Sequence, residues 1–214
     1  MTYLQLVNSV LRRLREDEVT SVSQTTYSKL IGDFVNDAKA LVEVAWPWNN
    51  LRTEIVVGTT ASTFQYTLTG AGTVPQVINA INEESNTFMY YKTPSWFDNQ
   101  FKNNTPSEGS PEFFTFRGLN GDDSLIDVYP IPDASYTLLF NVVVGLEPLV
   151  NNSDALLIPA QPVVQTAYAM ALRERGETGG QSGAEQFVVA DTFLADAIAM
   201  DASKNPEQLV WRAV

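Results

Sequence analysis

The sequence predicts an α+β fold. In it, helices from both ends of the chain form a four-helix bundle, and an antiparallel β-domain (a sandwich or an open barrel) is inserted between them. Apolar residues recur at helical spacing over residues 1–49 and 148–203, and they alternate with polar residues over residues 50–147. Pro206 then ends the helical pattern, so residues 204–214 are expected to form an extended C-terminal tail.

Two amphipathic helices begin the chain. The first has arginines near its end, where cations stabilise the helix dipole, and its apolar stripe comprises Leu4, Val7, Val10, Leu11 and Leu14. The second has a wider stripe and stops before Pro47. That wider stripe comprises Tyr27, Leu30, Ile31, Phe34, Val35, Ala38, Leu41, Val42 and Ala45. Neither helix can bury its stripe alone, so we expect the two to pack as an αα-hairpin.

The middle of the chain has the two-residue period of β-strands. Phe64, Tyr66 and Leu68 alternate with polar residues, which is typical of a half-buried strand. Similar strands are predicted at 52–58, 76–81, 87–92, 112–117, 124–129 and 135–144. Turn sequences such as Asn120-Gly121-Asp122-Asp123 separate them, and one short helix within 94–102 is expected to cap the sheet.

The helical pattern returns after Pro148. A third helix follows Pro159 and Pro162, and its apolar side comprises Val163, Val164, Ala167, Tyr168, Ala171 and Leu172. The composition of residues 176–183 predicts a flexible loop, after which Ser182 and Glu185 match a capping box for a fourth helix. The apolar face predicted for this helix comprises Phe187, Val188, Leu194, Ala195 and Ile198.

The composition excludes many kinds of active site. The 214-residue chain has neither cysteine nor histidine, which excludes disulfides, thiolate or imidazole metal ligands and Ser-His-Asp triads. Its 13 Lys+Arg and 25 Asp+Glu give a formal net charge of −12, a field that repels nucleic acid and anionic lipid. The N-terminus lacks a signal-peptide layout, and no apolar run approaches the roughly 20 residues that span a bilayer. We expect a soluble protein made in the cytosol, with no cofactor and no membrane contact.

A few groups of residues are candidates for chemical sites. The Gly-rich loop at 176–183 lacks the Gly-Lys-Ser/Thr ending of a phosphate-binding loop and is expected to be a linker. Asp122, Asp123 and Asp127 do not have calcium-loop spacing, and a hairpin turn explains the first two. The carboxylates that could serve a glycosidase are Glu83, Glu84, Glu108 and Glu112, and nothing in the sequence places them in an apolar pocket. We therefore expect no catalytic residue and no metal site.

Two features indicate protein partners. The tail presents Leu209, Val210, Trp211 and Arg212 after the last helix, and Trp and Arg are common at binding hot spots. This segment either docks on another chain or folds back on its own core. The aromatic residues between Phe88 and Phe116 either fill the core or form contacts between subunits.

Several segments resemble the head-to-tail adaptor family of short-tailed bacteriophages, the group that contains tail tubular protein A. They are Tyr3-Leu4-Gln5-Leu6-Val7-Asn8, Ile31-Gly32-Asp33-Phe34-Val35-Asn36-Asp37-Ala38, the run from Val44 to Leu51 with Trp46-Pro47-Trp48, and Leu157-Ile158-Pro159. The resemblance implies a ring, usually of about twelve copies, beneath the portal. Such a ring extends the DNA channel and receives nozzle or tail-fibre proteins. It also implies that Leu209, Val210, Trp211 and Arg212 contact the portal and that the β-domain supplies outer, lower or tail-facing surfaces.

The resulting hypothesis is a non-enzymatic virion protein, a head-to-tail adaptor of the neck assembled in the host cytoplasm. In it, DNA passes through the ring without specific binding. Two alternatives remain open from the residues alone. One is a virion-associated peptidoglycan hydrolase that uses the glutamates named above. The other is a carbohydrate-binding or cell-surface module, which would explain the aromatic residues but not four helices and a tail.

Overall fold

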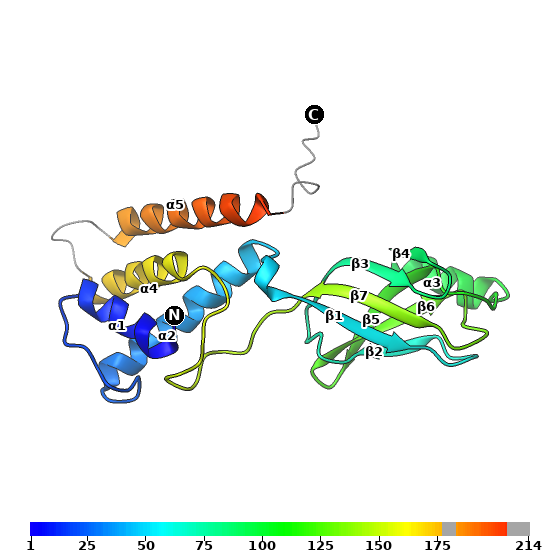
Figure 1. Ribbon diagram of the computed structural model, residues 1–214, viewed down its shortest axis with the longest axis horizontal. Helices are drawn as coiled ribbons and strands as arrows, with labels where there is room; N and C mark the ends of the chain where they lie inside the picture. The colour runs from blue at the N-terminus through cyan, green and yellow to red at the C-terminus, as the bar shows by residue number, and fades with distance from the viewer. Residues whose placement is uncertain (177–182, 205–214) are drawn as a thin grey trace, which may run out of the picture. The chain divides into compact units, whose positions relative to one another are not determined.

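The computed structural model describes residues 1–176 and 183–204, and the chain divides into two compact units (Figure 1). Unit 1 consists of Met1–Asn50 and the described residues from Leu146 onward, and unit 2 consists of Leu51–Gly145. Each unit contains its own buried apolar side chains. That these units are the domains expected from the sequence, with boundaries at 49–50 and 147–148, stays a prediction.

The described part of unit 1 contains four helices. They are α1 (Tyr3–Arg13), α2 (Thr26–Ala45), α4 (Ala160–Arg175) and α5 (Gly183–Ala202). Thr2 caps α1 by accepting a hydrogen bond from the N–H of Gln5, whose side chain accepts one from the N–H of Thr2. Thr25 and Ser28 cap α2 in the same way. Gly176 ends α4 with a left-handed φ of 62°, a conformation that glycine adopts without steric cost.

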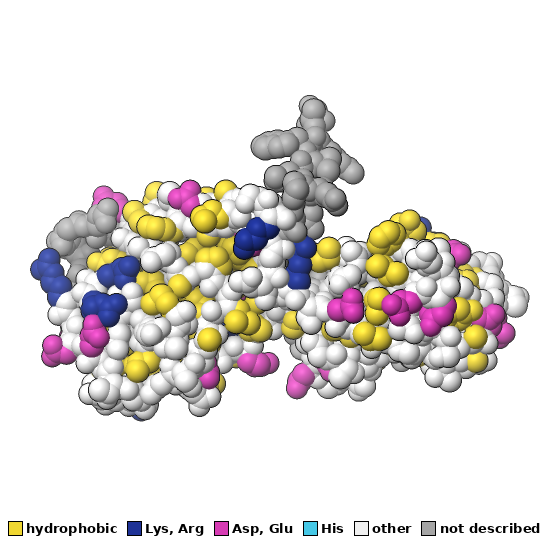
Figure 2. Space-filling view, viewed as in Figure 1, with side chains coloured by type: hydrophobic (Ala, Val, Ile, Leu, Met, Phe, Trp, Pro, Cys, Tyr) yellow, Lys and Arg dark blue, Asp and Glu magenta, His cyan; other side chains and the backbone are white. Residues whose placement is uncertain are grey.

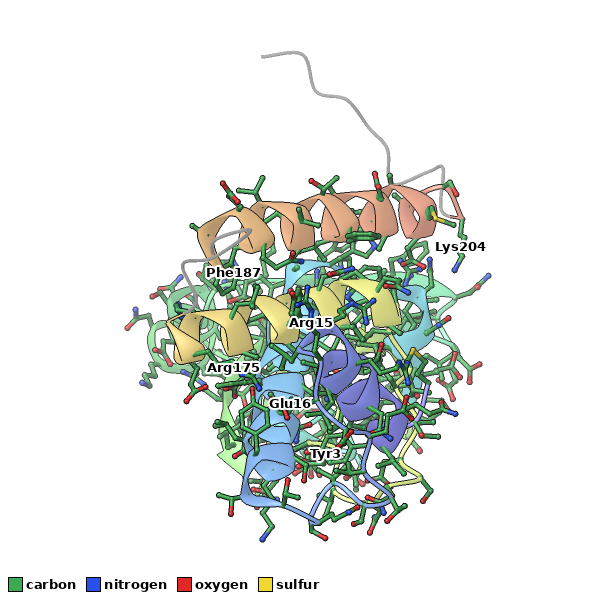
Figure 3. All side chains as sticks on the ribbon, turned by 90° about the vertical axis from the view of Figure 1, so that its left-hand side faces the viewer. Tyr3, Arg15, Glu16, Arg175, Phe187 and Lys204 are labelled. Atoms are coloured by element: carbon green, nitrogen blue, oxygen red, sulfur yellow. The ribbon has the colours of Figure 1, made fainter. Side chains whose placement is uncertain are left out.

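α4 is the central helix of unit 1. It contacts α1, α2 and α5, and it lies between α5 and α1 in both Figure 1 and Figure 3. Val163 and Ala167 of α4 are fully buried. α1 and α2 approach closely at Gly32, where an added Cβ would lie 2.5 Å from the Tyr3 hydroxyl. α5 packs chiefly on α4, so only one side of α5 is covered by described residues.

The apolar faces predicted for two of these helices are wrong in part. On α2, Leu41 and Ala45 are exposed although Val42 between them is buried. On α5, Val188 and Ala195 are exposed although both belong to the predicted face. On α2 the helix is covered over a narrower arc than its apolar stripe, so only the centre of the stripe is buried. On α5 no residue of the predicted face is buried, because the helix packs on α4 through Gln186 and Ala190, which lie beside that face.

Buried polar contacts join the two sequence-distant parts of unit 1. The amide of Asn36 donates to the carbonyl of Leu149 at 3.1 Å and accepts from its N–H at 2.9 Å. Lys39 Nζ donates to the carbonyl of Leu146 at 2.8 Å and lies 2.8 Å from Glu43 Oε1. The Lys39–Glu43 contact is an ion pair rather than a well-directed hydrogen bond, because Oε1 has no partner with hydrogen-bond geometry.

Unit 2, whose residues 51–145 are all described, is built on one seven-stranded sheet in the order β1-β7-β3-β4-β5-β6-β2. The strands are β1 (Arg52–Gly58), β2 (Gln65–Leu68), β3 (Gln76–Asn82), β4 (Thr87–Tyr91), β5 (Phe113–Asn120), β6 (Asp123–Tyr129) and β7 (Thr137–Val143). The edge strands β1 and β2 also contact each other, so the sheet nearly closes. Its concave side holds the core, which includes Leu68, Met89, Phe114, Ile126 and Phe140.

One strand pair departs from the antiparallel arrangement expected from the sequence. β4 and β5 are parallel, with Tyr90 opposite Phe113 and Tyr91 opposite Phe114. Parallel neighbours need a crossover connection rather than a tight turn. Residues 92–112 supply it, and they carry the short helix α3 (Pro94–Asp98) and the π-helical turn η2 (Asn99–Asn103).

The helices and strands expected from the sequence are confirmed at each predicted position that the structure describes. The predicted capping pair of the last helix includes Ser182, which lies outside the described residues. The parallel pair β4–β5 was not predicted. Two expectations stay predictions. One is that the four helices form a closed bundle, and the other is that unit 2 is a sandwich or an open barrel.

Candidate interaction surfaces

The first candidate surface is the exposed side of α5. This helix turns Gln186 and Ala190 toward α4, and both are buried. Val188, which is 66% exposed, lies on the opposite side one turn from the exposed Asp191. Met200, which is 73% exposed, and Phe193 follow Gln186 at helical repeats and lie at the edge of the side that faces α4. Figure 2 shows apolar side chains spread over this part of unit 1. A helix that is apolar on all sides is normally buried on all sides, so this exposure indicates a missing partner.

Asp201 fixes the C-terminal end of α5. Its carboxylate Oδ2 accepts from Trp46 Nε1 at 3.1 Å and from the Asn49 N–H at 3.0 Å, and Lys204 Nζ lies 3.1 Å from Oδ1. Burial raises the pKa of this carboxyl, but the hydrogen bonds from Asn49, Lys204 and Trp46 lower it more, so the net pKa is below its usual value. A charged Asp201 therefore holds α5 to the end of α2.

The second candidate surface lies where α1 and α4 end. α1 has Arg12 and Arg13 in its last turn, Arg15 follows, and α4 has Arg173 and Arg175 in its last turn. Figure 2 shows Lys and Arg side chains gathered at this end, and Figure 3 shows Arg15 beside Arg175 and Glu16. We call Arg12, Arg15 and Arg173 the arginine end, because these three are exposed.

Arg175 joins the two helices at this end and is not part of that surface. Its guanidinium donates to the Tyr27 hydroxyl at 2.7 Å, to the carbonyl of Leu14 at 3.4 Å and to Glu16 at 2.6 Å. Arg12 pairs with Glu18 at 2.7 Å, but both side chains are more than half exposed and such pairs contribute little to stability. Arg173 lies over the Phe187 ring of α5 at 5.4 Å.

The third candidate surface is on the outer face of the sheet in unit 2. Over β5, β6 and β2 this face is covered by α3 and η2. Trp96 packs on Phe113 at 5.1 Å and on Tyr129 at 5.4 Å. Arg117 joins the cover to the sheet by pairing with Asp98 and Asp127 at 2.8 and 2.7 Å. The hydrogen bond from Arg117 and then that from Lys102 lower the pKa of Asp98. Described residues do not cover the outer face of β1, β7, β3 and β4 in this way.

An apolar row crosses this uncovered half. Val56 lies opposite Leu139, Leu139 opposite Ile81, and Ile81 opposite Phe88, so the four side chains line up across β1, β7, β3 and β4. Val56 is 59% exposed and Phe88 is 57% exposed. We call these four residues the sheet row. Polar side chains border it, including Asn79, whose amide bonds to Asn141 at 2.6 Å. An exposed apolar row with a polar border is typical of a protein-binding surface.

The family comparison agrees with a protein whose surfaces are made for partners. A model of the family described as SU10 adaptor protein matches residues 1–207. The chain belongs to the SU10 adaptor protein family. It is thus a phage adaptor with a structural, non-enzymatic role. No curated protein matches it.

The portal-binding residues proposed for the adaptor, Leu209, Val210, Trp211 and Arg212, lie outside the described residues. So does most of the Gly-rich loop at 176–183.

The glutamates considered for hydrolysis in the adaptor, Glu83, Glu84, Glu108 and Glu112, are all exposed. Glu84 accepts from the N–H and hydroxyl of Thr137 at 2.6 and 2.8 Å, and these hydrogen bonds lower its pKa. A general acid needs the opposite shift.

The aspartates considered as cation ligands have separate structural roles in the adaptor. Asp122 lies in the two-residue turn between β5 and β6, as predicted. Asp123 Oδ1 accepts from the N–H groups of Gly70 and Gly72, and Asp127 pairs with Arg117. Over residues 1–176 and 183–204 no group of three or more acidic side chains is arranged to hold a metal ion, and no helix is long and apolar enough to cross a membrane.

Sequence reasoning missed the surfaces that the structure brings out in the adaptor. It placed Phe88 among the aromatic residues with two possible roles, and the structure divides that set: Phe97 and Phe114 are core, whereas Phe88 and Tyr90 are exposed. The sheet row depends on strand order and register, which no local pattern reveals. The exposed side of α5 did have a signal, because apolar residues in 183–202 occur on all sides of the helix.

Proposed function

We propose that this adaptor forms a ring that joins the portal to the tail nozzle, as in the tail tubular protein A-like proteins of short-tailed phages. A ring of about twelve copies would extend the DNA channel at the neck of the virion and serve genome ejection. The observation that carries the proposal is the adaptor family match over residues 1–207.

The exposed surfaces support a protein with several partners. A ring subunit must contact two neighbours, the component above it and the component below it. The exposed side of α5 and the sheet row are two separate apolar surfaces on separate units. We assign the sheet row to nozzle or tail-fibre proteins, because the outer face of unit 2 is left uncovered there. The net charge of −12 suits a channel through which DNA passes without specific binding.

We further assign portal contact to Leu209, Val210, Trp211 and Arg212. This assignment is supported by the sequence, since Trp and Arg contribute most binding energy when they fill partner pockets.

The experiment is native mass spectrometry of the chain alone and mixed with the portal protein encoded beside it. We expect a portal complex that gains about twelve copies of the chain. A second arm uses a chain shortened to residues 1–204, which should keep its circular dichroism spectrum and bind the portal more weakly. A full-length chain that never binds the portal would contradict the proposed function. Equal binding by the shortened chain would contradict the portal assignment alone.

A further inference from the structure

We propose that the arginine end of one copy docks on the exposed side of α5 in a second copy, so that subunits join head to tail. This inference rests on the proposed adaptor function and names the surfaces through which neighbouring subunits would meet. Because the two surfaces differ, the contact is heterologous, the kind that closes into a ring when the rotation between copies permits it.

Charge complementarity is the first argument for a second copy. The sequence of α5, residues 183–202, contains four acidic residues, Glu185, Asp191, Asp196 and Asp201, and no lysine or arginine. Asp201 is buried and bonded within its own unit, whereas Asp191 and Asp196 are exposed, and Asp191 lies one turn from the exposed Val188. The surface that covers this helix should therefore be cationic with apolar stems, which describes arginine side chains.

The arginine end meets that requirement, although acidic residues lie near it. Glu18 pairs with Arg12 and Glu16 pairs with Arg175, so two of these acids are already engaged within the chain. Asp17 and Glu174 are exposed nearby. The exposed side chain of Arg15 has no ion-pair partner among the described residues.

The backbone at Arg15 is the second, independent argument. Arg15 has a left-handed φ of 60° at the position that follows the last turn of α1. Its N–H bonds to the Arg12 carbonyl and the Glu16 N–H bonds to the Leu11 carbonyl, the hydrogen-bond pattern of a helix end where glycine is preferred. An arginine at a position that suits glycine is strained, and such strain is found at functional positions.

The test uses two charge-reversed variants of the full chain and sedimentation velocity at low salt. Variant A carries Arg12→Glu and Arg15→Glu, and variant B carries Asp191→Lys and Asp196→Lys. Each variant alone should associate at least about tenfold more weakly than the wild type, because like charges now meet at the contact. A mixture of A and B should recover association, since each contact then joins opposite charges, and its subunits must alternate.

Matched controls keep the net-charge changes while leaving both surfaces intact. Lys29→Glu with Lys102→Glu matches variant A, and Asp33→Lys with Asp37→Lys matches variant B. All four positions are exposed and lie outside the two surfaces. The controls should associate as the wild type does. Arg15→Asn keeps a residue that tolerates the left-handed region while removing the charge, so it should weaken association without lowering the melting temperature.

Three results would overturn this inference: a wild type that stays monomeric at all concentrations, variants that associate as the wild type does, or a mixture of A and B that associates no better than either alone. If variant B instead loses only portal binding and keeps self-association, α5 is the portal contact and the inference is wrong. None of these results touches the adaptor function, which depends on whether the portal gains copies of the full-length chain.

Discussion

Asp201 illustrates how one side chain fixes a helix that buries little of its own surface. Asp201 is 6% exposed, and its carboxylate connects α5 to Trp46 and Asn49 at the end of α2. Replacing it by asparagine removes the charge while keeping the shape. We expect Asp201→Asn to lower the free energy of unfolding of unit 1 by about 1–3 kcal/mol at pH 7, because buried N–H donors lose a charged acceptor.

The pH dependence of that loss follows from the lowered pKa of Asp201 in the folded state. The pKa of an aspartate in an unfolded chain is about 3.9. A carboxyl whose folded pKa is below that value stabilises the fold at higher pH, and this stabilisation is lost as the pH falls through the folded pKa. The stability difference between the wild type and Asp201→Asn should thus be constant from neutral pH to about pH 5 and shrink in more acidic solution. Urea unfolding across this range measures it, with Asp37→Asn as the exposed control. A difference that does not change with pH would contradict this account.

Replacing Gly32 by alanine should lower the stability of unit 1, whereas the same replacement within a helix usually raises stability. Glycine to alanine in the middle of a helix normally stabilises by about 1 kcal/mol. Here the new Cβ would lie 2.5 Å from the Tyr3 hydroxyl and 2.9 Å from Val22 Cγ1, so the buried Tyr3 and Val22 side chains must shift. We expect Gly32→Ala to destabilise unit 1 by about 1–3 kcal/mol in thermal or urea unfolding.

The companion variant Tyr3→Phe removes the hydroxyl that causes the closest contact. Combined with Gly32→Ala, it should recover part of the lost stability, and the double-mutant cycle should show a favourable coupling. Additive effects of the two substitutions on the free energy of unfolding would show that the Tyr3 hydroxyl is not the cause of the destabilisation by Gly32→Ala.

At the scale of elements, local sequence patterns were sufficient for some features and not for others. The periods of apolar residues located α1, α2, α4 and α5 and the strands of unit 2, because each element carries its own signal. The parallel pairing of β4 with β5 could not be read in this way, since strand order depends on contacts between residues far apart in sequence. Equally, the position of Asp201 as an acceptor for Trp46 and Asn49 joins residues about 150 positions apart.

The candidate surfaces show the same division. The apolar character of α5 on all sides is visible in the sequence, but which side is left uncovered depends on its packing on α4. The arginines near the end of α1 were noted as a helix-end feature, whereas their meeting with those of α4 required the fold. Leu209 to Arg212, assigned from the family resemblance, lie outside the described residues.

Two aromatic residues of unit 2 should respond differently to substitution. One is buried under the cover formed by α3 and η2, and the other lies on the exposed sheet row. Phe97 is fully buried between α3 and the sheet, with Tyr129 at 6.4 Å. We expect Phe97→Ala to destabilise unit 2 by about 3–5 kcal/mol in urea unfolding, because it leaves a cavity. Phe88→Ser, on the exposed sheet row, should change stability by no more than about 0.5 kcal/mol. If Phe88→Ser proved as damaging as Phe97→Ala, the row would belong to the core rather than to a binding surface.

At the scale of the whole molecule, the helical core and the core of the sheet are formed by different parts of the chain. The core of unit 2 is formed within Leu51–Gly145, and the helices of unit 1 come from both ends of the chain. Insertion of one compact unit into another is tolerated when the inserted chain supplies its own core and its ends lie close together. The ends meet this condition, because Arg52 of β1 pairs with Val143 of β7.

We therefore expect the isolated segment Leu51–Gly145 to fold by itself. Its buried residues include Leu68, Ile126 and Phe140 from three different strands, and the nearly closed sheet leaves few unpaired strand edges. Expressed alone, it should give a cooperative thermal transition and dispersed amide signals in a nitrogen–proton correlation spectrum. The complementary chain, residues 1–50 joined by a short Gly-Ser linker to 146–214, should keep the helical circular dichroism of unit 1. If Leu51–Gly145 stayed unfolded while the full chain melted in a single transition, the two units would be one cooperative domain, and surfaces on them could not be tested apart.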